Sequence, residues 1–314
     1  MQKLLDHPRF WLFAPFIGLI GLTLIALGFW HMASDRITDR LAAQGLSWQR
    51  LTPQGFPARI TLDVDAPRLR RDDRLWQNQA MRLTFMPFNH RHAVVDFTGP
   101  HRLETPQGEL QLAHQGNLMS LVTDGQGLQR GSFEAQQPVL NGRWQNRPLT
   151  LQAKQMGMHM RRGAAPGRVD AALVLKDLQT VPQGTQIERF DMLTDIPESW
   201  LQAAPQAQER IKLLRLTVER AGLTLVVRGS VKLAASGFLD GQLDVDVLNQ
   251  AALLDTLQDF GWLAPQQRRQ AAFLFGLGAA FGGDTQDRLS VPISLKDGRV
   301  FLGPLDVAAA PRWQ

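Results

Sequence analysis

A long apolar run near the start of the chain places the strongest limit on its structure. Residues Phe10 to Met32 span 23 positions and include no Asp, Glu, Lys or Arg. As a helix with 1.5 Å per residue, the run would measure roughly 34 Å, which is enough to cross a hydrocarbon core of about 30 Å. Trp11 and Trp30 lie near its two ends, where aromatic side chains meet the membrane interface. The run therefore predicts a single transmembrane helix, with residues 1–33 as an N-terminal membrane anchor.

A cleaved signal peptide is the alternative explanation of this segment. The apolar region of a signal peptide normally has about 7–15 residues, so the run from Phe10 to Met32 is too long. The best cleavage position follows Ala33, where His31 and Met32 do not form a small-x-small site. We therefore expect an uncleaved signal-anchor.

The charges beside the run do not decide its orientation. Lys3 and Arg9 precede it, and Arg36 and Arg40 follow it, so the two flanks carry similar positive charge. A short head before a long body without cysteine favours a head in the cytoplasm and a body outside it. In a bacterium, this predicts a single-pass protein of the inner membrane with its body in the periplasm.

Beyond the anchor, short segments alternate polar and apolar residues as half-buried strands do. In Arg59–Asp65, the side chains of Ile60, Leu62 and Val64 point to one face. Further segments of this kind are Met81–Phe85, Ala93–Phe97, Glu109–Leu112, Leu118–Val122, Leu128–Phe133, Leu149–Ala153, Arg168–Leu175, Lys212–Arg220, Leu223–Val227, Gly229–Ala235, Gly237–Val247, Arg288–Leu295 and Arg299–Val307. Turn residues such as Gly99-Pro100 separate them, and Asp297-Gly298 between the last two segments is typical of a hairpin. The pattern predicts a mostly β fold of the α+β class, with a curled antiparallel meander as the body.

A few helices are expected around this sheet. Ser34 is a plausible N-cap for a short helix that ends before Gly45, and Asn249 for a helix from Gln250 to Phe260. An apolar helix is expected from Pro265 to Phe281, and residues 182–210 are expected to form a connection with a helix start near Pro197. The division that follows is an anchor at 1–33, a first β-rich half at 34–181, and a second β-rich half with two helices at 182–314.

Composition excludes several kinds of chemistry. The chain has no cysteine, which excludes disulfides, thiolate nucleophiles and cysteine-bound metals, and no tyrosine. The formal net charge of +5 over 314 residues is weak for a nucleic-acid-binding protein. No G-x-S-x-G, phosphate loop or dinucleotide fingerprint occurs in a fitting context. We therefore expect no catalytic activity, no cofactor and no nucleic-acid partner.

Two patterns resemble metal sites. On a strand, His90 and His92 face the same side, with His101 and His114 as the nearest candidates for a third ligand. The pairs Asp63-x-Asp65 and Asp244-x-Asp246 resemble D-x-D motifs. The histidines sit in a turn context, and the aspartates fall on predicted solvated faces, so no metal site is predicted.

Two motifs resemble those of a known family. Gly55-Phe56-Pro57-Ala58-Arg59 before an alternating strand resembles a G-F-P-x-R signature, and Lys296–Pro304 resembles a closing K-D-G-R-x-x-L-G-P hairpin. With the N-terminal anchor, both are similar to the bacterial domain-of-unknown-function family 2125. Gly237–Leu254 also resembles the C-terminal repeats of AsmA-like envelope proteins, a likeness that implies a sheet curled into an apolar groove.

Two functions remain open at this point. One is a lipid-handling module of the cell envelope whose concave face takes the acyl chains of membrane lipid. The other is a non-enzymatic envelope scaffold or assembly factor that binds protein partners. For the lipid-handling function, the expected apolar groove is lined by Ile60, Leu62, Val64, Leu83, Phe85, Phe273, Leu277 and Phe281.

Overall fold

The computed structural model describes residues 8–86, 89–125, 127–180, 184–201, 209–259, 268, 272, 288–302 and 305–309, with most side chains from residue 19 onward. The helices are α2 (Pro8–Ala43), the 3-10 helix η1 (Glu198–Leu201) and α3 (Gln250–Asp259). The strands are β1 (Leu46–Ser47), β2 (Arg50–Gln54), β3 (Ile60–Asp65), β4 (Arg68–Arg71), β5 (Arg74–Gln77), β6 (Ala80–Met86), β7 (Asn89–Thr98), β8 (His101–Thr105), β9 (Gly108–Ala113), β10 (Gly116–Asp124), β11 (Gly127–Gln136), β12 (Val139–Trp144), β13 (Arg147–Gln152), β14 (Gln155–Arg162), β15 (Arg168–Thr180), β16 (Gln186–Pro197), β17 (Arg210–Arg220), β18 (Leu223–Leu233), β19 (Leu239–Leu248), β20 (Arg288–Lys296), β21 (Arg299–Leu302) and β22 (Leu305–Ala309).

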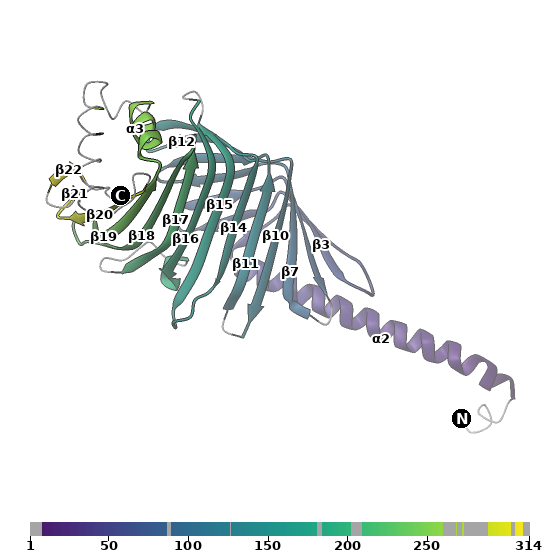
Figure 1. The fold of residues 1–314 in the computed structure, drawn as a ribbon. Coiled ribbons are helices and arrows are strands. Elements are labelled where there is room, and N and C mark those ends of the chain that lie inside the picture. The colour runs from purple at the N-terminus through teal and green to yellow at the C-terminus, as the bar shows by residue number, and fades with distance from the viewer. Residues whose placement is uncertain are drawn as a thin grey trace.

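The strands of the described residues form one 22-stranded antiparallel sheet (Figure 1). The prediction of a mostly β fold built on a large antiparallel sheet is confirmed. Each strand from β15 onward pairs with the next along the chain, up to β22. Before β15 the meander consists of longer, bent strands, and each of these contains two labelled strands in sequence. For example, β3 continues into β4 and β5 continues into β6, and the two bent strands pair with each other.

The bends divide this part of the sheet into two arms. The long arm contains β2, β3, β6, β7, β10, β11 and β14 and continues through β15 to β22, whereas the short arm contains β1, β4, β5, β8, β9, β12 and β13. The chain crosses between the arms at residues with left-handed backbone, including Ala66, Gly99 and Gln137. Asn78 holds the bend, because its side-chain amide donates to the carbonyls of Gly99 and Pro100, both at 3.2 Å.

Two glycines allow β18 and β19 to approach closely. Gly229 and Gly241 have φ angles of 147° and 159°, which side-chain-bearing residues rarely adopt. A Cβ on Gly229 would lie 2.2 Å from the backbone oxygen of Gln242, and one on Gly241 would lie 2.1 Å from that of Ser230. Glycine at these positions therefore leaves room for the backbone of the facing strand.

The two faces of the long arm differ in chemistry. One face carries cross-strand ion pairs between arginine and aspartate, such as Arg82 with Asp63 at 2.6 Å and Arg228 with Asp246 at 3.1 Å. We call this the polar face. The aspartates of the D-x-D pairs are predicted on a solvated face. The ion-paired Asp63 and Asp246 lie on this polar face, where Asp65 also pairs with Arg50 at 2.6 Å. The opposite face is apolar and is described below.

Helix α2 packs on the apolar face at the start of the sheet and then projects beyond it (Figure 1). Trp30 is 7% exposed and donates from Nε1 to the carbonyl oxygen of Arg59 at 2.9 Å. The prediction that a new helix begins at Ser34 is wrong, because α2 continues to Ala43. The buried hydroxyl of Ser34 donates to the carbonyl of Trp30 one turn earlier. Its hydrogen bond is therefore made within the helix, and Ser34 does not act as an N-cap.

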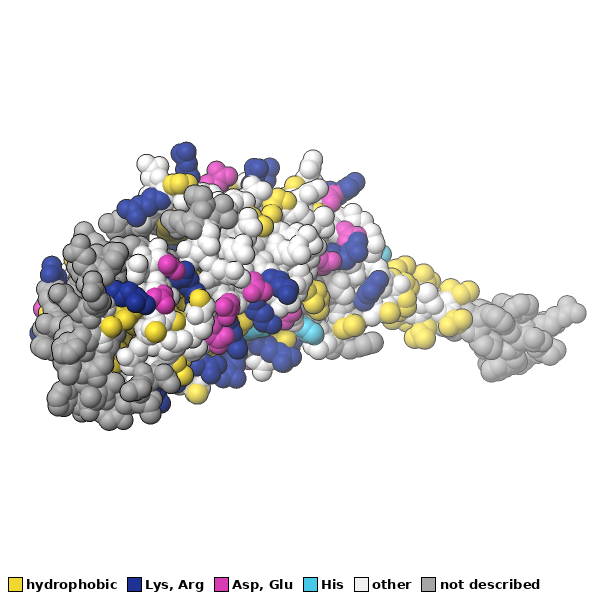
Figure 2. All heavy atoms as spheres, turned by 45° about the horizontal axis from the view of Figure 1, so that its top comes forward, with side chains coloured by type: hydrophobic (Ala, Val, Ile, Leu, Met, Phe, Trp, Pro, Cys, Tyr) yellow, Lys and Arg dark blue, Asp and Glu magenta, His cyan; other side chains and the backbone are white. Residues whose placement is uncertain are grey.

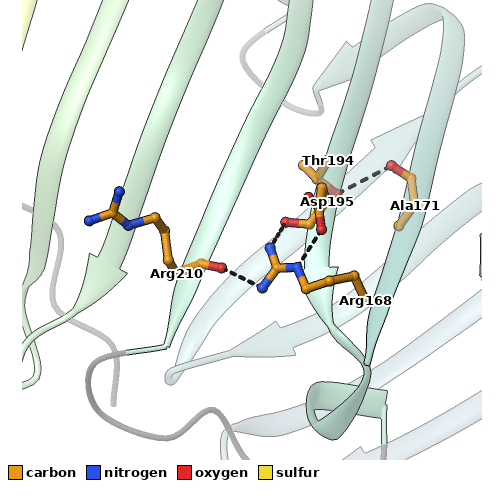
Figure 3. Close-up of polar contacts among 5 residues, drawn as sticks. All are labelled: Arg168, Ala171, Thr194, Asp195 and Arg210. Carbon is orange, nitrogen blue, oxygen red and sulfur yellow. Dashed lines mark hydrogen bonds and ion pairs between the residues drawn. The ribbon is translucent and has the colours of Figure 1, made fainter. Parts of the chain in front are cut away.

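The predicted connection at residues 182–210 is also wrong in part, because β16 occupies residues 186–197. Pro182, Gly184 and Pro197 indicated a connection there. Within β16, Thr194 is a polar residue in an otherwise apolar position. Its buried hydroxyl donates to the carbonyl of Ala171 at 3.2 Å, as Figure 3 shows. On the other face, Arg168 pairs with Asp195 at 2.5 Å and donates to the carbonyl of Arg210 at 2.9 Å. These contacts join β15, β16 and β17 where β17 bulges.

Two other predictions are confirmed near the C-terminus. Asn249 caps α3, since its Oδ1 accepts from the amide of Ala252 at 3.1 Å. Asp297-Gly298 closes the hairpin between β20 and β21, where Lys296 faces Arg299. The predicted helix Pro265–Phe281 lies outside the described residues, apart from isolated helical positions at 268 and 272.

The projecting part of α2 has an apolar surface. Figure 2 shows hydrophobic side chains gathered on it, whereas charges of both signs are interspersed over the body. Within the part of the chain whose side chains are described, no helix is both long enough and apolar enough to cross a membrane. The side chains of residues 10–18 lie outside that part, and the transmembrane helix stays a prediction.

Candidate functional surface

The apolar face of the long arm contains an unbroken row of hydrophobic residues across twelve strands. Each member of the row faces the next in register from β3 to β20. The row consists of Leu62, Leu83, Val95, Met119, Phe133, Met158, Leu173, Met192, Leu216, Val227, Val245 and Val291. Side chains directly opposite each other lie close enough to pack. The sheet therefore presents one continuous apolar face from the α2 end to the α3 end.

Helices cover this face at its two ends. Under α2, the residues Leu62, Leu83 and Val95 are 0%, 6% and 4% exposed and pack with Trp30. At the other end, Ala252 of α3 packs with the buried Leu223, Val247 and Leu289. These two closed cores are ordinary protein interior.

Between the closed cores the same row is more exposed. Its members there are half-buried, apart from Met158, which is 44% exposed. We call this part the open stretch, and it consists of Phe133, Met158, Leu173, Met192, Leu216 and Val227. With neighbouring strands about 4.8 Å apart, its six strands extend for roughly 24 Å.

Methionines are concentrated on this face. Met81, Met119, Met156, Met158, Met160 and Met192 all point to it, which is six of the nine methionines in the chain. Methionine is unbranched and polarizable, so it adapts to irregular apolar partners. The open stretch is therefore suited to a flexible apolar ligand.

Two histidines lie where the arms meet. The rings of His101 and His114 are 5.2 Å apart, and His101 also contacts the rings of Trp76, Phe97 and Phe133. Burial lowers the pKa of His101 to about 4, with a smaller contribution from His114. Burial also lowers the pKa of His114, against opposing effects of its hydrogen bond to Gly99 and the charge of Asp96.

Asn117 connects this histidine pair to the long arm. Its Nδ2 lies 3.2 Å from Nδ1 of His114 and 3.4 Å from Nε2 of His101, while its Oδ1 accepts from the amide of Phe97. The lowered pKa values keep both imidazoles neutral at neutral pH. The pair is therefore a polar joint inside the fold that acid would charge.

The residues predicted to line a groove occupy two kinds of position. Ile60, Leu62, Val64, Leu83 and Phe85 share the apolar face and are all buried in the closed core under α2. The predicted groove residues Phe273, Leu277 and Phe281 lie outside the described residues. The open stretch was not singled out from the sequence, although its strands alternate in the same way.

The predicted metal ligands are not brought together. His92 is on the polar face, with its Nε2 3.0 Å from Oγ of Ser120, whereas His101 and His114 lie on the opposite side of the sheet. The side chain of His90 lies outside the described part. Among described residues, no three His, Cys, Asp or Glu side chains are grouped to hold a metal ion.

Comparison with known proteins places the chain in a family. The model of the DUF2125 family, described as an uncharacterised protein conserved in bacteria, matches residues 30–311. The chain belongs to the DUF2125 family. The DUF2125 match covers both arms of the sheet and α3, together with the part of α2 that packs against the sheet.

The other comparisons add no relative. No curated protein and no solved structure matched the chain. The likeness to AsmA-like envelope proteins is therefore not confirmed. Membership of DUF2125 carries no activity with it, so function has to be argued from the surface itself.

Proposed function

We propose that this DUF2125 protein is a membrane-anchored, non-enzymatic module of the bacterial cell envelope that handles lipid. The observation that carries the proposal is the open stretch of the apolar face. It joins the two closed cores, and no helix among the described residues covers it. Its occupant would be the acyl chains of a membrane lipid.

The dimensions of the open stretch fit this occupant. Its length of roughly 24 Å exceeds the hydrocarbon depth of one membrane leaflet, which is half of about 30 Å. Each methylene that leaves water for an apolar surface contributes about 0.8 kcal/mol. A single acyl chain would therefore bind appreciably without any polar contact.

The N-terminal segment supports the proposed location. Residues of α2 beyond the sheet expose large apolar side chains, with Leu22 at 65% and Ile25 at 72%. A contiguous exposed apolar surface of this kind is rare in soluble monomers and marks a membrane or protein contact. Together with the charge-free run from Phe10 to Met32, it favours a single-pass anchor in the inner membrane with the body in the periplasm.

The geometry also suggests a direction. The row of apolar residues begins at the sheet end on which α2 packs and runs toward the end covered by α3. Figure 1 shows where these two helices lie. A lipid on the open stretch would thus lie on a path that leads from the anchored end of the sheet toward its far end.

Native mass spectrometry of the gently extracted full-length chain tests the proposal. We expect co-purified lipid with the wild type, loss of that lipid with Leu216→Asp, and retention with Thr217→Asp. Leu216 and Thr217 are neighbours on β17 that point to opposite faces, so the second variant is a matched control.

Two outcomes would contradict lipid handling. One is a wild-type protein without bound lipid, and the other is equal lipid content in both variants. Crosslinked protein partners in place of lipid would support the envelope scaffold instead.

A further inference from the structure

The polar face carries a hollow of about 550 Å³ over β10, β11, β14 and β15. The register places Arg130 directly opposite Arg161 across β11 and β14, and Ser132 opposite His159 in the next row. All four residues line the hollow, together with Ser120 on β10. This site lies on the opposite side of the sheet from the open stretch.

A second hollow of about 370 Å³ adjoins the first. Arg130 and Arg161 line both hollows, and Arg162 lines the second. These arginines lie near the start of β11 and at the end of β14.

Among the described residues, only two of these three arginines have a carboxylate partner. Arg161 pairs with Asp170 at 3.0 Å, and Arg162 binds Asp124 through two hydrogen bonds of 2.6 and 2.9 Å. In the part of the chain that the structure describes, no carboxylate forms an ion pair with Arg130. The residue directly opposite it, Arg161, is also a cation. Like charges opposite each other destabilise a sheet, so an anion between them would relieve that repulsion.

We propose that Arg130 and Arg161 bind a phosphate group in this pair of hollows. Guanidinium groups match phosphate oxygens in geometry and charge, and two of them can hold one phosphate from two strands. The hydroxyl of Ser132 and the imidazole of His159 are placed to add hydrogen bonds from the row beside them. The volume lies in the range of small-molecule sites, which leaves room for more than the phosphate itself.

Two kinds of molecule carry this chemistry. One is a soluble phosphate ester, and the other is the headgroup of a phospholipid. The inference goes beyond the lipid-handling proposal, because it concerns the other face of the sheet and does not depend on acyl chains.

Isothermal titration calorimetry on the full-length chain in detergent micelles tests the proposal. The probes are inorganic phosphate, glycerol 3-phosphate, dihexanoyl phosphatidylglycerol and dihexanoyl phosphatidylcholine. The test variant is Arg130→Gln with Arg161→Gln. The matched control is Lys176→Gln with Arg189→Gln, a facing cation pair on the same face that lies outside both hollows.

We expect at least one phosphate probe to bind, and its affinity to fall about tenfold or more in the test variant but not in the control. Binding of phosphatidylglycerol without inorganic phosphate would identify a headgroup site. Comparable binding of glycerol 3-phosphate would identify a soluble ester. Binding that weakens as salt rises would agree with either source.

The proposal is overturned if no probe binds the wild type, or if the two double variants lose affinity equally. These results are separate from those for lipid handling. Leu216→Asp should bind the same phosphate probe as the wild type even where it loses co-purified lipid, because Arg130 and Arg161 lie on the other face of the sheet.

Discussion

The closed core under α2 and the open stretch are two regions of one apolar face with the same alternation of residues. At one end of the row, Leu62 is fully buried, and further along it Met158 is 44% exposed. Both point to the same side of the sheet, and a chain of facing residues joins them. The difference therefore lies in what covers each region and not in the strands themselves.

The cover at the closed end comes from a helix. Trp30 and Ile37 of α2 pack on Leu62 and its neighbours, where leucine, valine, isoleucine and phenylalanine dominate. The open stretch lies beyond the reach of that helix and contains methionine on β14 and β16. A face that remains half-exposed and adaptable is what a surface for a transient apolar ligand requires, whereas a rigid core needs fixed shapes.

The largest expected effect is a charge placed in each region. Leu62→Asp puts an unpaired carboxylate into a closed core and should cost about 4 kcal/mol or more, which is enough to unfold many domains. Met158→Asp leaves its carboxylate in contact with water and should cost about 1 kcal/mol or less. Urea unfolding of the full-length chain in detergent micelles would measure both.

The comparison would fail if the two variants were equally destabilised. That result would mean that the open stretch is closed in solution and that the whole face is ordinary core. Leu62→Ala and Met158→Ala provide a second pair without charge, for which we expect about 2–5 kcal/mol and under about 1 kcal/mol.

Much of the fold follows from local patterns in the sequence. The alternation in Arg59–Asp65 indicated which of its side chains face the core, and Asn249 and Asp297-Gly298 indicated a helix start and a hairpin. Local chemistry decides these features, because a cap or a tight turn is satisfied by residues a few positions away.

Other features depend on distant partners. Gly99-Pro100 predicted a turn between strands, but the chain bends there into the short arm, because the amide of Asn78 binds both carbonyls. Ser34 predicted a helix start, although packing on the sheet carries the helix past it. Exposure of the open stretch could not be predicted either, since alternation shows which face is apolar and not whether anything covers it.

The second prediction concerns pH and the joint between the arms. His101 has a pKa of about 4 in the folded chain and an ordinary value near 6.5 when unfolded. Between these values the unfolded state binds the proton more readily, so stability falls as pH drops from about 6.5 to 4. The loss should be about 1–2 kcal/mol, allowing for solvent screening of a group that is only partly buried.

Thermal unfolding of the full-length chain at a series of pH values would measure this loss. His101→Phe keeps an aromatic ring among Trp76, Phe97 and Phe133 and should flatten the dependence between pH 6.5 and 4. An unaltered slope in the His101 variant would show that other groups cause the acid sensitivity.

The smallest expected effect concerns the far closed core, which α3 covers. Asn249 has a φ of 67°, and its side chain caps the helix through the amide of Ala252. Replacement by alanine removes the cap and should lower the stability of α3 by about 1 kcal/mol, whereas glycine, which tolerates the backbone angle, should cost only a few tenths. Hydrogen exchange at the amide of Leu223, which packs beneath α3, should then become about fivefold faster with Asn249→Ala and change little with Asn249→Gly. Exchange at Leu216 in the open stretch should stay the same in both variants, because neither α2 nor α3 packs on it. If Leu216 exchanged faster along with Leu223, the two regions would open as one unit, and the open stretch would depend on α3 for its order.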